Sequence, residues 1–305
     1  NGQASNGCSP ARGPRCIGVQ HHIAHVLSCM AENEVQLPAL GVAWDGTGYG
    51  TDGTIWGGEF FLAANDSIER VATLRPFPLP GGNAAVKEPR RAALGLLFAM
   101  VGDAVFADHN LRTVAAFSPA ELALLRTMLK GGLNSPMTSS IGRLFDVVAS
   151  LVGLRQQMRF EGEAAMDLEF ALAGPERAPL YSLPLITGHS PMQLDWQPLI
   201  EELLADFRSG VPLGQIAAGF HNALAEAIVA VARQAGQTRV ALSGGCFQNR
   251  YLTERTVQRL RDEGFQPYWH QRVPANDGGI ALGQVVAALR QEHSLNYRKQ
   301  IPKCV

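Results

Sequence analysis

The chain has 305 residues, a formal net charge of −1 at pH 7 and 17% charged residues. A charge so close to zero excludes the strongly basic surface that is typical of a nucleic-acid-binding protein. No apolar run approaches transmembrane length, and the N-terminus lacks the charged-then-apolar order of a signal peptide. We therefore expect a cytoplasmic protein that meets no membrane.

The cysteines are five in number and include no C-x-x-C pair. Structural disulfides and a thiolate zinc site are therefore not expected. The low charged fraction also indicates that a partner or a further domain covers part of the surface.

The N-terminal part combines a polar segment with a histidine-rich helix. Residues 1–16 are rich in Gly, Pro and Ser without periodicity, which predicts an irregular segment or the cut edge of a longer protein. Residues 19–33 have helical composition, and His21 and His25 lie four apart, so they project from one face. An apolar run at 37–44 then predicts a buried strand.

The most distinctive stretch is residues 45–59, D-G-T-G-Y-G-T-D-G-T-I-W-G-G-E, with six glycines in fifteen residues. Such glycines let the backbone bring N–H groups close to a ligand, and successive N–H groups form an anion-binding concavity. We expect a ligand-binding loop here, with Asp45 at the strand exit and a returning strand at 57–64. A glycine-rich hairpin that binds nothing is the alternative.

Downstream, apolar periodicity and turn residues predict alternating strands and helices. The expected helices are 89–100, 119–130, 139–153, one opening at F-E-G-E-A-A-M-D-L-E, 196–208, 213–235, 250–264 and 279–290. The expected strands are two short ones within 180–195, then 239–242 and 266–269, and residues 291–305 are expected to form a polar, frayed tail. This alternation predicts an α/β fold with a nucleotide-sized ligand at the carboxyl ends of the strands.

The histidine-rich helix is a candidate metal site. Two neutral histidines at i and i+4 can bind one divalent cation. A zincin protease motif would need Glu after the first His, and His22 stands there, so a metalloprotease is not expected. Asp45 and Asp277, each at the start of a loop, are the candidate oxygen ligands. A histidine-rich helix without metal is the alternative, and the sequence does not choose the ion.

A second glycine turn, S-G-G-C-F-Q-N at 243–249, follows the strand at 239–242. At a helix N-terminus it can contact a phosphate or a nucleoside, although an ordinary strand–turn–helix link has the same sequence features. Cys246 is a possible nucleophile, but a small buried residue is the favoured interpretation. His221, on an apolar helix, is expected to be a structural histidine with satisfied hydrogen bonds.

Five motifs occur in an order that resembles one family. They are V-Q-H-H-x-A-H, the 45–59 stretch, F-E-G-E-A-A-M, S-G-G-C-F-Q-N and P-x-N-D-G-G. Together they resemble the C-terminal domain of HypF, the carbamoyltransferase of [NiFe]-hydrogenase maturation. The resemblance covers residues 17–290. It implies an α/β actin-like ATPase (ASKHA) fold with two lobes, of which the first is truncated at its N-terminal end.

The resemblance also implies roles for individual residues. It places His21, His25, Asp45 and Asp277 on a divalent metal, with zinc or iron as the expected ion and Mg as a further option. It gives catalytic roles to His22 and Asp45. It places Gly46, Thr47, Gly48 and Gly50 on the phosphate side of a nucleotide, and Glu161, Gly162, Gly244, Gly245 and Asn249 on the nucleoside side.

The implied reaction passes the carbamoyl group of carbamoyl adenylate, made from carbamoyl phosphate and ATP, to the C-terminal cysteine of a HypE-type partner. No YrdC-like segment is recognisable in these 305 residues, so such a domain would supply the adenylate in cis or in trans. Two alternatives stay open. One is an O-carbamoyltransferase or a relative of the tRNA threonylcarbamoyl transferases, and the other is a non-catalytic remnant that binds nucleotide or a partner.

Overall fold

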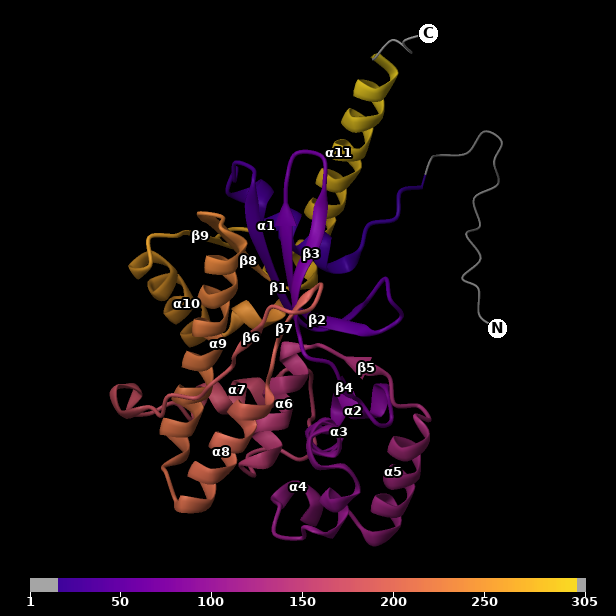
Figure 1. Ribbon diagram of the computed structural model, residues 1–305, viewed down its shortest axis with the longest axis vertical. Coiled ribbons are helices and arrows are strands. Elements are labelled where there is room, and N and C mark those ends of the chain that lie inside the picture. Colours follow the sequence, from indigo (N-terminus) through magenta and orange to yellow (C-terminus); the bar gives the residue numbers. More distant parts are fainter. Residues whose placement is uncertain (1–15, 301–305) are drawn as a thin grey trace.

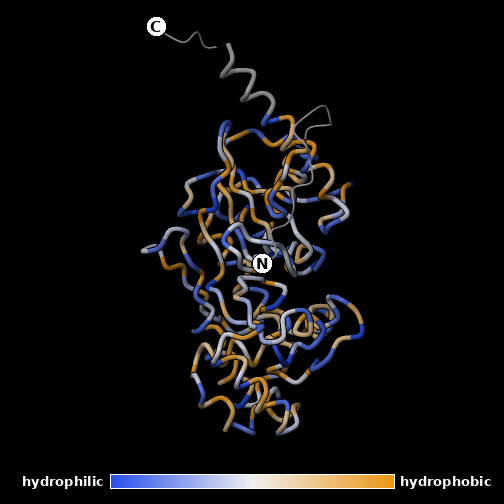
Figure 2. Tube along the Cα trace, turned by 90° about the vertical axis from the view of Figure 1, so that its right-hand side faces the viewer, coloured by the Kyte–Doolittle hydropathy of each residue, from blue (hydrophilic) through white to orange (hydrophobic). Residues whose placement is uncertain are grey.

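The structure, a computed structural model, describes residues 16–300, with side chains up to residue 291. Most of the expected irregular N-terminal segment, and the last five residues of the expected tail, lie outside the described residues. Figure 1 shows an elongated molecule with a sheet in its upper part and a mainly helical lower part, and Figure 2 shows the same division from the side.

The sheet is built around β1 (Ala39–Tyr49). β2 (Ile55–Ala63) and β3 (Ile68–Leu74) follow it as an antiparallel meander, whereas β8 (Arg239–Ser243) and β9 (Gln266–Trp269) run parallel to it. The order is β6-β7-β3-β2-β1-β8-β9, with β4 and β5 off this path. The carboxyl end of β8 therefore lies beside Ala43 of β1, just before Asp45, and the carboxyl ends of parallel strands are where α/β sheets bind ligands.

The remaining strands are short and join the sheet to the lower part. They are β4 (Phe77–Pro78), β5 (Met137–Thr138), β6 (Leu185–Ile186) and β7 (Met192–Leu194). β7 is parallel to β3, and β5 is parallel to β2.

Two helices lie on one face of the sheet. α1 (His21–Glu32) begins where the Gln20 side chain accepts a hydrogen bond from Ile23 N–H, and it packs Val26 and Cys29 against Ala39 and Ala43 of β1. α11 (Ile280–Gln300) contacts α1. Because β1 alternates its faces, its other side chains enter the larger core on the opposite face.

The opposite face is covered by α6 (Ile141–Leu151) and α9 (Leu213–Ala235). α6 is buried nearly all round, as its apolar sequence predicts, and even its Arg143 and Asp146 are inside. α10 (Arg250–Asp262) packs on α9, and α7 (Glu163–Phe170) packs on α6.

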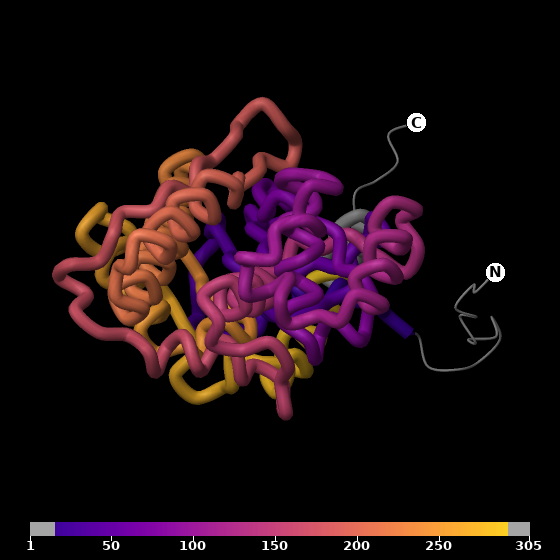
Figure 3. Tube along the Cα trace, turned by 90° about the horizontal axis from the view of Figure 1, so that it is seen from below, coloured from indigo at the N-terminus to yellow at the C-terminus, as the bar shows by residue number. Residues whose placement is uncertain are grey.

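The lower part is formed by the chain between β3 and α9. Its helices are α2 (Asn83–Lys87), α3 (Pro89–Val101), α4 (Arg112–Ala115), α5 (Pro119–Gly131) and α8 (Gln197–Ser209). Short 3₁₀ turns are η1 (Gly102–Ala107), η2 (Pro175–Arg177), η3 (Gly245–Gln248) and η4 (Asp277–Gly279). Seen from below, α8 and α9 lie on one side and α3 to α5 on the other (Figure 3).

The structure corrects four expectations. β1 continues past Trp44 to Tyr49, with a register shift between Trp44 and Gly48, so much of the glycine-rich stretch pairs with β2 instead of forming a free loop. β3 was not predicted from the sequence. α11 extends beyond residue 290 to Gln300, where a frayed tail was expected.

The fourth correction concerns α9. Within residues 16–300, α9 is long and apolar enough to cross a membrane, contrary to the expectation that no segment approaches this length, but 78% of its most apolar window is buried inside the fold. It is a core helix.

Candidate functional site

A cavity of about 610 Å³ lies at the carboxyl ends of β1 and β8. Its walls come from the end of β1, α6, α7, η3 and the turn before α11. The residues are Asp45, Gly46, Thr47, Gly142, Arg143, Phe145, Asp146, Glu161, Gly162, Ala165, Met166, Glu169, Phe170, Gly245, Cys246, Gln248, Asn249, Asn276, Asp277 and Gly278. Volumes of about 300–1,000 Å³ are usual for sites that bind small ligands.

The four predicted metal ligands meet at one end of this cavity. His21 and His25 project from the first turns of α1, and their Nε2 atoms lie 3.1 and 3.4 Å from Asp45 Oδ2. Asp277 Oδ1 lies 3.6 and 3.4 Å from the same two nitrogens. One ligand atom from each residue falls within 4.8 Å of all the others. Segments more than 200 residues apart in sequence thus form one cluster.

The donor set fits a divalent cation. His25 is 1% exposed, and among the described residues its Nε2 has no partner in hydrogen-bonding geometry, although it faces both carboxylates. A buried polar atom without a partner is costly, and a cation among the four groups would satisfy it. Two neutral imidazoles and two carboxylates also neutralise a charge of +2, and all suit zinc or iron.

The protein already holds Asp45 as a carboxylate. Burial would raise its pKa, but the hydrogen bond from His21 and the attraction of the nearby His25 ring outweigh burial and hold the pKa well below its ordinary value. The hydrogen bond to Asp45 in turn raises the pKa of His21. Gly245 N–H also donates to Asp45 Oδ1 over 3.2 Å, which ties the cluster to the glycine turn after β8.

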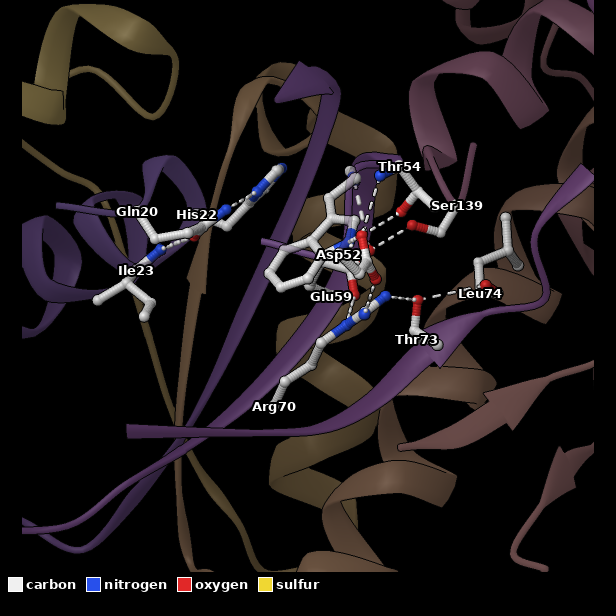
Figure 4. Close-up of polar contacts among 12 residues, drawn as sticks. Gln20, His22, Ile23, Asp52, Thr54, Glu59, Arg70, Thr73, Leu74 and Ser139 are labelled. Atoms are coloured by element: carbon white, nitrogen blue, oxygen red, sulfur yellow. Dashed lines mark hydrogen bonds and ion pairs between the residues drawn. The ribbon is translucent and has the colours of Figure 1, made fainter. Parts of the chain in front are cut away.

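His22 lies away from the cavity. Its side chain is fully buried, and its Nδ1 lies 3.1 Å from the Gln20 amide. Figure 4 shows this contact. A side chain on Gly48 would overlap the His22 ring, so the glycine lets β1 approach α1 here. Burial lowers the pKa of His22 to about 3, which keeps the ring neutral at pH 7.

The second half of the glycine-rich stretch forms a polar network with Arg70 and Ser139 (Figure 4). Glu59 is fully buried, accepts Arg70 Nε–H at 2.5 Å and accepts the Ser139 hydroxyl. Arg70 also pairs with Asp52 at 3.0 Å and lies 3.9 Å above the Trp56 ring, whose Nε1–H donates to Asp52. This network fixes the hairpin between β1 and β2.

The predicted nucleotide-contacting residues divide into two groups. The cavity is lined by Gly46, Thr47, Glu161, Gly162, Gly245 and Asn249. The others lie elsewhere: Gly48 faces the rings of His21 and His22, Gly50 faces Trp56, and Gly244 packs on the backbone of Trp44 with φ +100°. At these three glycines a side chain would overlap neighbouring atoms, so their role in the structure is to allow close packing.

The Arg143–Asp146 pair on the cavity wall was not predicted as part of the site. The two side chains are 2.8 Å apart and 2–3% exposed. Burial outweighs the attraction of Arg143 and raises the pKa of Asp146 to about 6. The sequence signal was present, because a charge pair at i and i+3 interrupts an otherwise apolar helix at 141–151.

His221 matches its favoured interpretation, whereas Cys246 is only partly buried and lines the cavity. Burial raises the pKa of the Cys246 thiol well above its ordinary value, so the group stays protonated at neutral pH. His221 contacts Ala217 O at 2.7 Å through Nδ1 and the Asn249 amide at 2.9 Å through Nε2, so both ring nitrogens are satisfied. Asn249 also caps α10 by accepting Leu252 N–H.

Comparison with known proteins gives one family. The family model for the second subdomain of the Kae1-like carbamoyltransferase domain of HypF matches residues 41–284. The carbamoyltransferase HypF of Synechocystis sp. is 42% identical over 89% of this chain, which spans 37% of that protein. A HypF homolog of Cupriavidus necator is 39% identical, and the match covers 93% of this chain and 72% of that protein.

A solved structure agrees. A full-length HypF in a phosphate- and nucleotide-bound form superposes with a TM-score of 0.81 at 38% identity, covering 89% of this chain and 42% of its own. The expected α/β fold of the actin-like ATPase (ASKHA) class is thereby confirmed. The truncation of the first lobe stays a prediction.

Proposed function

The chain belongs to the HypF carbamoyltransferase family, and we propose that it transfers the carbamoyl group of carbamoyl adenylate to a cysteine thiol of a HypE-type partner. The supporting observation is that one cavity joins the His21–His25–Asp45–Asp277 cluster to a nucleotide-sized space. Because the chain spans 37% of the Synechocystis relative, the activity of such a whole protein is carried over here only as a proposal.

Carbamoyl adenylate would occupy the cavity with its phosphate side towards the cluster. Gly46 and Thr47 of β1 and Gly245 of η3 form the wall next to Asp45, and Glu161, Gly162 and Asn249 lie further along. The exposed apolar residues Met166 and Phe170 offer a surface for the base. A solved relative was obtained in a phosphate- and nucleotide-bound form, which supports nucleotide binding in this family.

His21, His25, Asp45 and Asp277 would hold the divalent metal, and a bound metal would stabilise the negative charge that develops as AMP leaves. The protein positions the reactants. The acceptor thiolate forms a C–S bond to the carbamoyl carbon, and the bond from that carbon to the phosphate oxygen breaks. Holding both groups in place is worth about 7–11 kcal/mol when the geometry is right.

We place the acceptor outside the chain in this proposal; Cys246 lines the cavity, but its raised pKa keeps the thiol protonated and therefore a poor nucleophile. We propose a C-terminal cysteine of a HypE-type protein as the acceptor and a YrdC-like domain, in cis or in trans, as the source of carbamoyl adenylate from carbamoyl phosphate and ATP. Both partners and the whole reaction are cytoplasmic in this proposal.

The test supplies the purified chain with carbamoyl adenylate from a separate YrdC-like domain and a peptide with the HypE C-terminus. Mass spectrometry should find the carbamoyl mass on the last cysteine. Asp45→Ala should abolish the product, because it removes a metal ligand and the contact to Gly245. Glu254→Ala, an exposed change on α10, is the control and should transfer like the wild type.

Two outcomes would contradict the proposal. Transfer to tRNA but not to the thiol would favour the threonylcarbamoyl transferase relative. The second outcome is nucleotide binding without transfer to any acceptor. If transfer is still absent after the upstream segment of a full-length relative has been joined to this chain, the non-catalytic remnant is favoured.

A further inference from the structure

Three buried side chains form a chain of hydrogen bonds behind the metal cluster. Glu32 is the last residue of α1, Ser243 ends β8, and His270 follows β9. His270 Nδ1 is 2.8 Å from Glu32 Oε2, and its Nε2 is 2.9 Å from the Ser243 hydroxyl. The side chains of Glu32 and His270 are 2% and 4% exposed, and Ser243 is fully buried.

This combination of residues resembles the triad of a hydrolase, but its environment does not suit catalysis. A nucleophile must reach its substrate, and Ser243 is closed off inside the fold. Because a carboxylate only accepts hydrogen bonds, His270 donates Nδ1–H to Glu32 and accepts the Ser243 hydroxyl at Nε2. The chain of hydrogen bonds therefore joins three segments of backbone instead of activating a nucleophile.

Glu32 also organises the loop that carries Asp277. Its Oε1 accepts the backbone N–H groups of Gln271, Arg272 and Val273 at 2.9, 2.5 and 3.3 Å. Burial opposes ionisation of Glu32, but these hydrogen bonds outweigh it and lower its pKa. A carboxylate therefore binds three consecutive N–H groups, which are hydrogen bonds of the strong, charge-assisted kind.

The position of Asp277 depends on this loop. The Asp277 side chain is 72% exposed, so packing around it does not fix it. The backbone of the loop is held instead, by Glu32 at its start, by Gly244 N–H, which donates to Ala275 O over 3.0 Å, and just beyond Asp277 by the Ser28 hydroxyl, which donates to Gly279 O over 2.8 Å. The N-terminal part of α1 thus presents the two proposed metal ligands His21 and His25. Through Glu32, the C-terminal end of α1 holds the loop that carries a third proposed ligand, Asp277.

We propose that Glu32 is a positioning residue of the metal site, which fixes loop 270–277 so that the Asp277 carboxylate meets His21 and His25. The inference rests on the metal site proposed above. Residues that orient metal ligands without touching the metal commonly change metal affinity by about 10–100-fold.

The first test measures the metal dissociation constant of the purified chain by zinc titration against a competing chelator. Glu32→Gln should weaken binding at least about tenfold, because a neutral amide holds the three N–H groups less firmly. Glu34→Gln is the matched control. Glu34 lies two residues after Glu32 and its side chain is exposed, so the variant loses the same charge without losing these contacts. It should bind zinc like the wild type.

A double-mutant cycle separates positioning from general damage. In the Asp277→Ala background, Glu32→Gln should have no further effect on zinc affinity, because the ligand that it positions is gone. An equal loss in both backgrounds would overturn the proposal. Ser243→Ala is a milder change at the far end of the hydrogen-bonded chain, and it should also weaken zinc binding, by a smaller factor. If Glu32→Gln does not fold, the zinc affinity of Ser243→Ala serves as the test of the proposal.

Hydrogen exchange in the metal-free protein gives an independent readout. Peptides covering 270–278 should exchange faster in Glu32→Gln than in Glu34→Gln, since the three amides lose their carboxylate acceptor. Unchanged exchange and unchanged affinity would overturn the positioning role. A wild-type chain that binds no zinc, iron or other divalent cation would overturn the metal site itself, and with it the effect of Glu32 on metal affinity.

Discussion

At the scale of single residues, the candidate site is assembled from side chains that lie far apart in the sequence. The H-x-x-x-H spacing and two aspartates at loop starts led to His21, His25, Asp45 and Asp277, which the fold brings within 4.8 Å. No local pattern pointed to Glu32 and His270, because they lie 238 residues apart and meet only after the sheet has formed. Glycines were overassigned to ligand contact, since Gly48 and Gly50 serve close packing.

Glu59 gives the clearest stability prediction at this scale. Glu59→Ala should lower the free energy of unfolding by about 3 kcal/mol, because it leaves Arg70 without its buried partner. This value is at the lower end of the range that is usual for breaking a buried ion pair, since Arg70 is 17% exposed and water reaches part of it. Urea denaturation monitored by circular dichroism measures the change.

The control for Glu59 is Glu254→Ala on the surface of α10, where an exposed ion pair contributes little. A loss for Glu59→Ala no larger than that for Glu254→Ala would show that the network in Figure 4 contributes little to the fold.

At the scale of elements, long apolar helices were predictable and strand ends were not. α3, α5, α8 and α9 lie within about two residues of their predicted bounds, because periodicity and Pro or Gly at the ends mark them. β1 was predicted too short, because pairing with β2 overrides the weak strand propensity of its glycines. β3 was missed because the charged Glu69 and Arg70 near its start interrupt the apolar pattern by which a strand is recognised.

α7 gives a prediction for nucleotide binding. AMP at saturating concentration should raise the melting temperature, since a ligand at 100 times its dissociation constant stabilises the folded state by about 2.7 kcal/mol. Ala165→Trp should remove this shift, because the indole would fill the cavity between α6 and α7. Differential scanning fluorimetry with and without AMP measures it.

Ala123→Trp on α5 is the matched control, an exposed helical alanine outside this cavity, and it should keep the shift. An AMP-dependent shift of the same size in Ala165→Trp would place the nucleotide elsewhere in the chain.

At the scale of the whole molecule, the sheet and its two layers of helices bring segments that are distant in sequence to one end of the sheet. α1, β1 and η4 supply the four side chains of the candidate metal cluster, β8 ends beside β1, and α6 and α7 close the cavity from the other side. The family was recognisable from the sequence because its motifs are the segments that form the cluster and the cavity, whereas the chain between them carries no such motif and its path was visible only in the structure.

The central claim is that metal and nucleotide share one site. The most direct measurement is a crystal structure of the chain with zinc and AMP, with anomalous diffraction recorded at the zinc edge. The account predicts an anomalous peak bounded by His21, His25, Asp45 and Asp277, with the AMP phosphate in the same cavity beside Gly46 and Gly245. A zinc peak at other residues, or AMP outside this cavity, would contradict it.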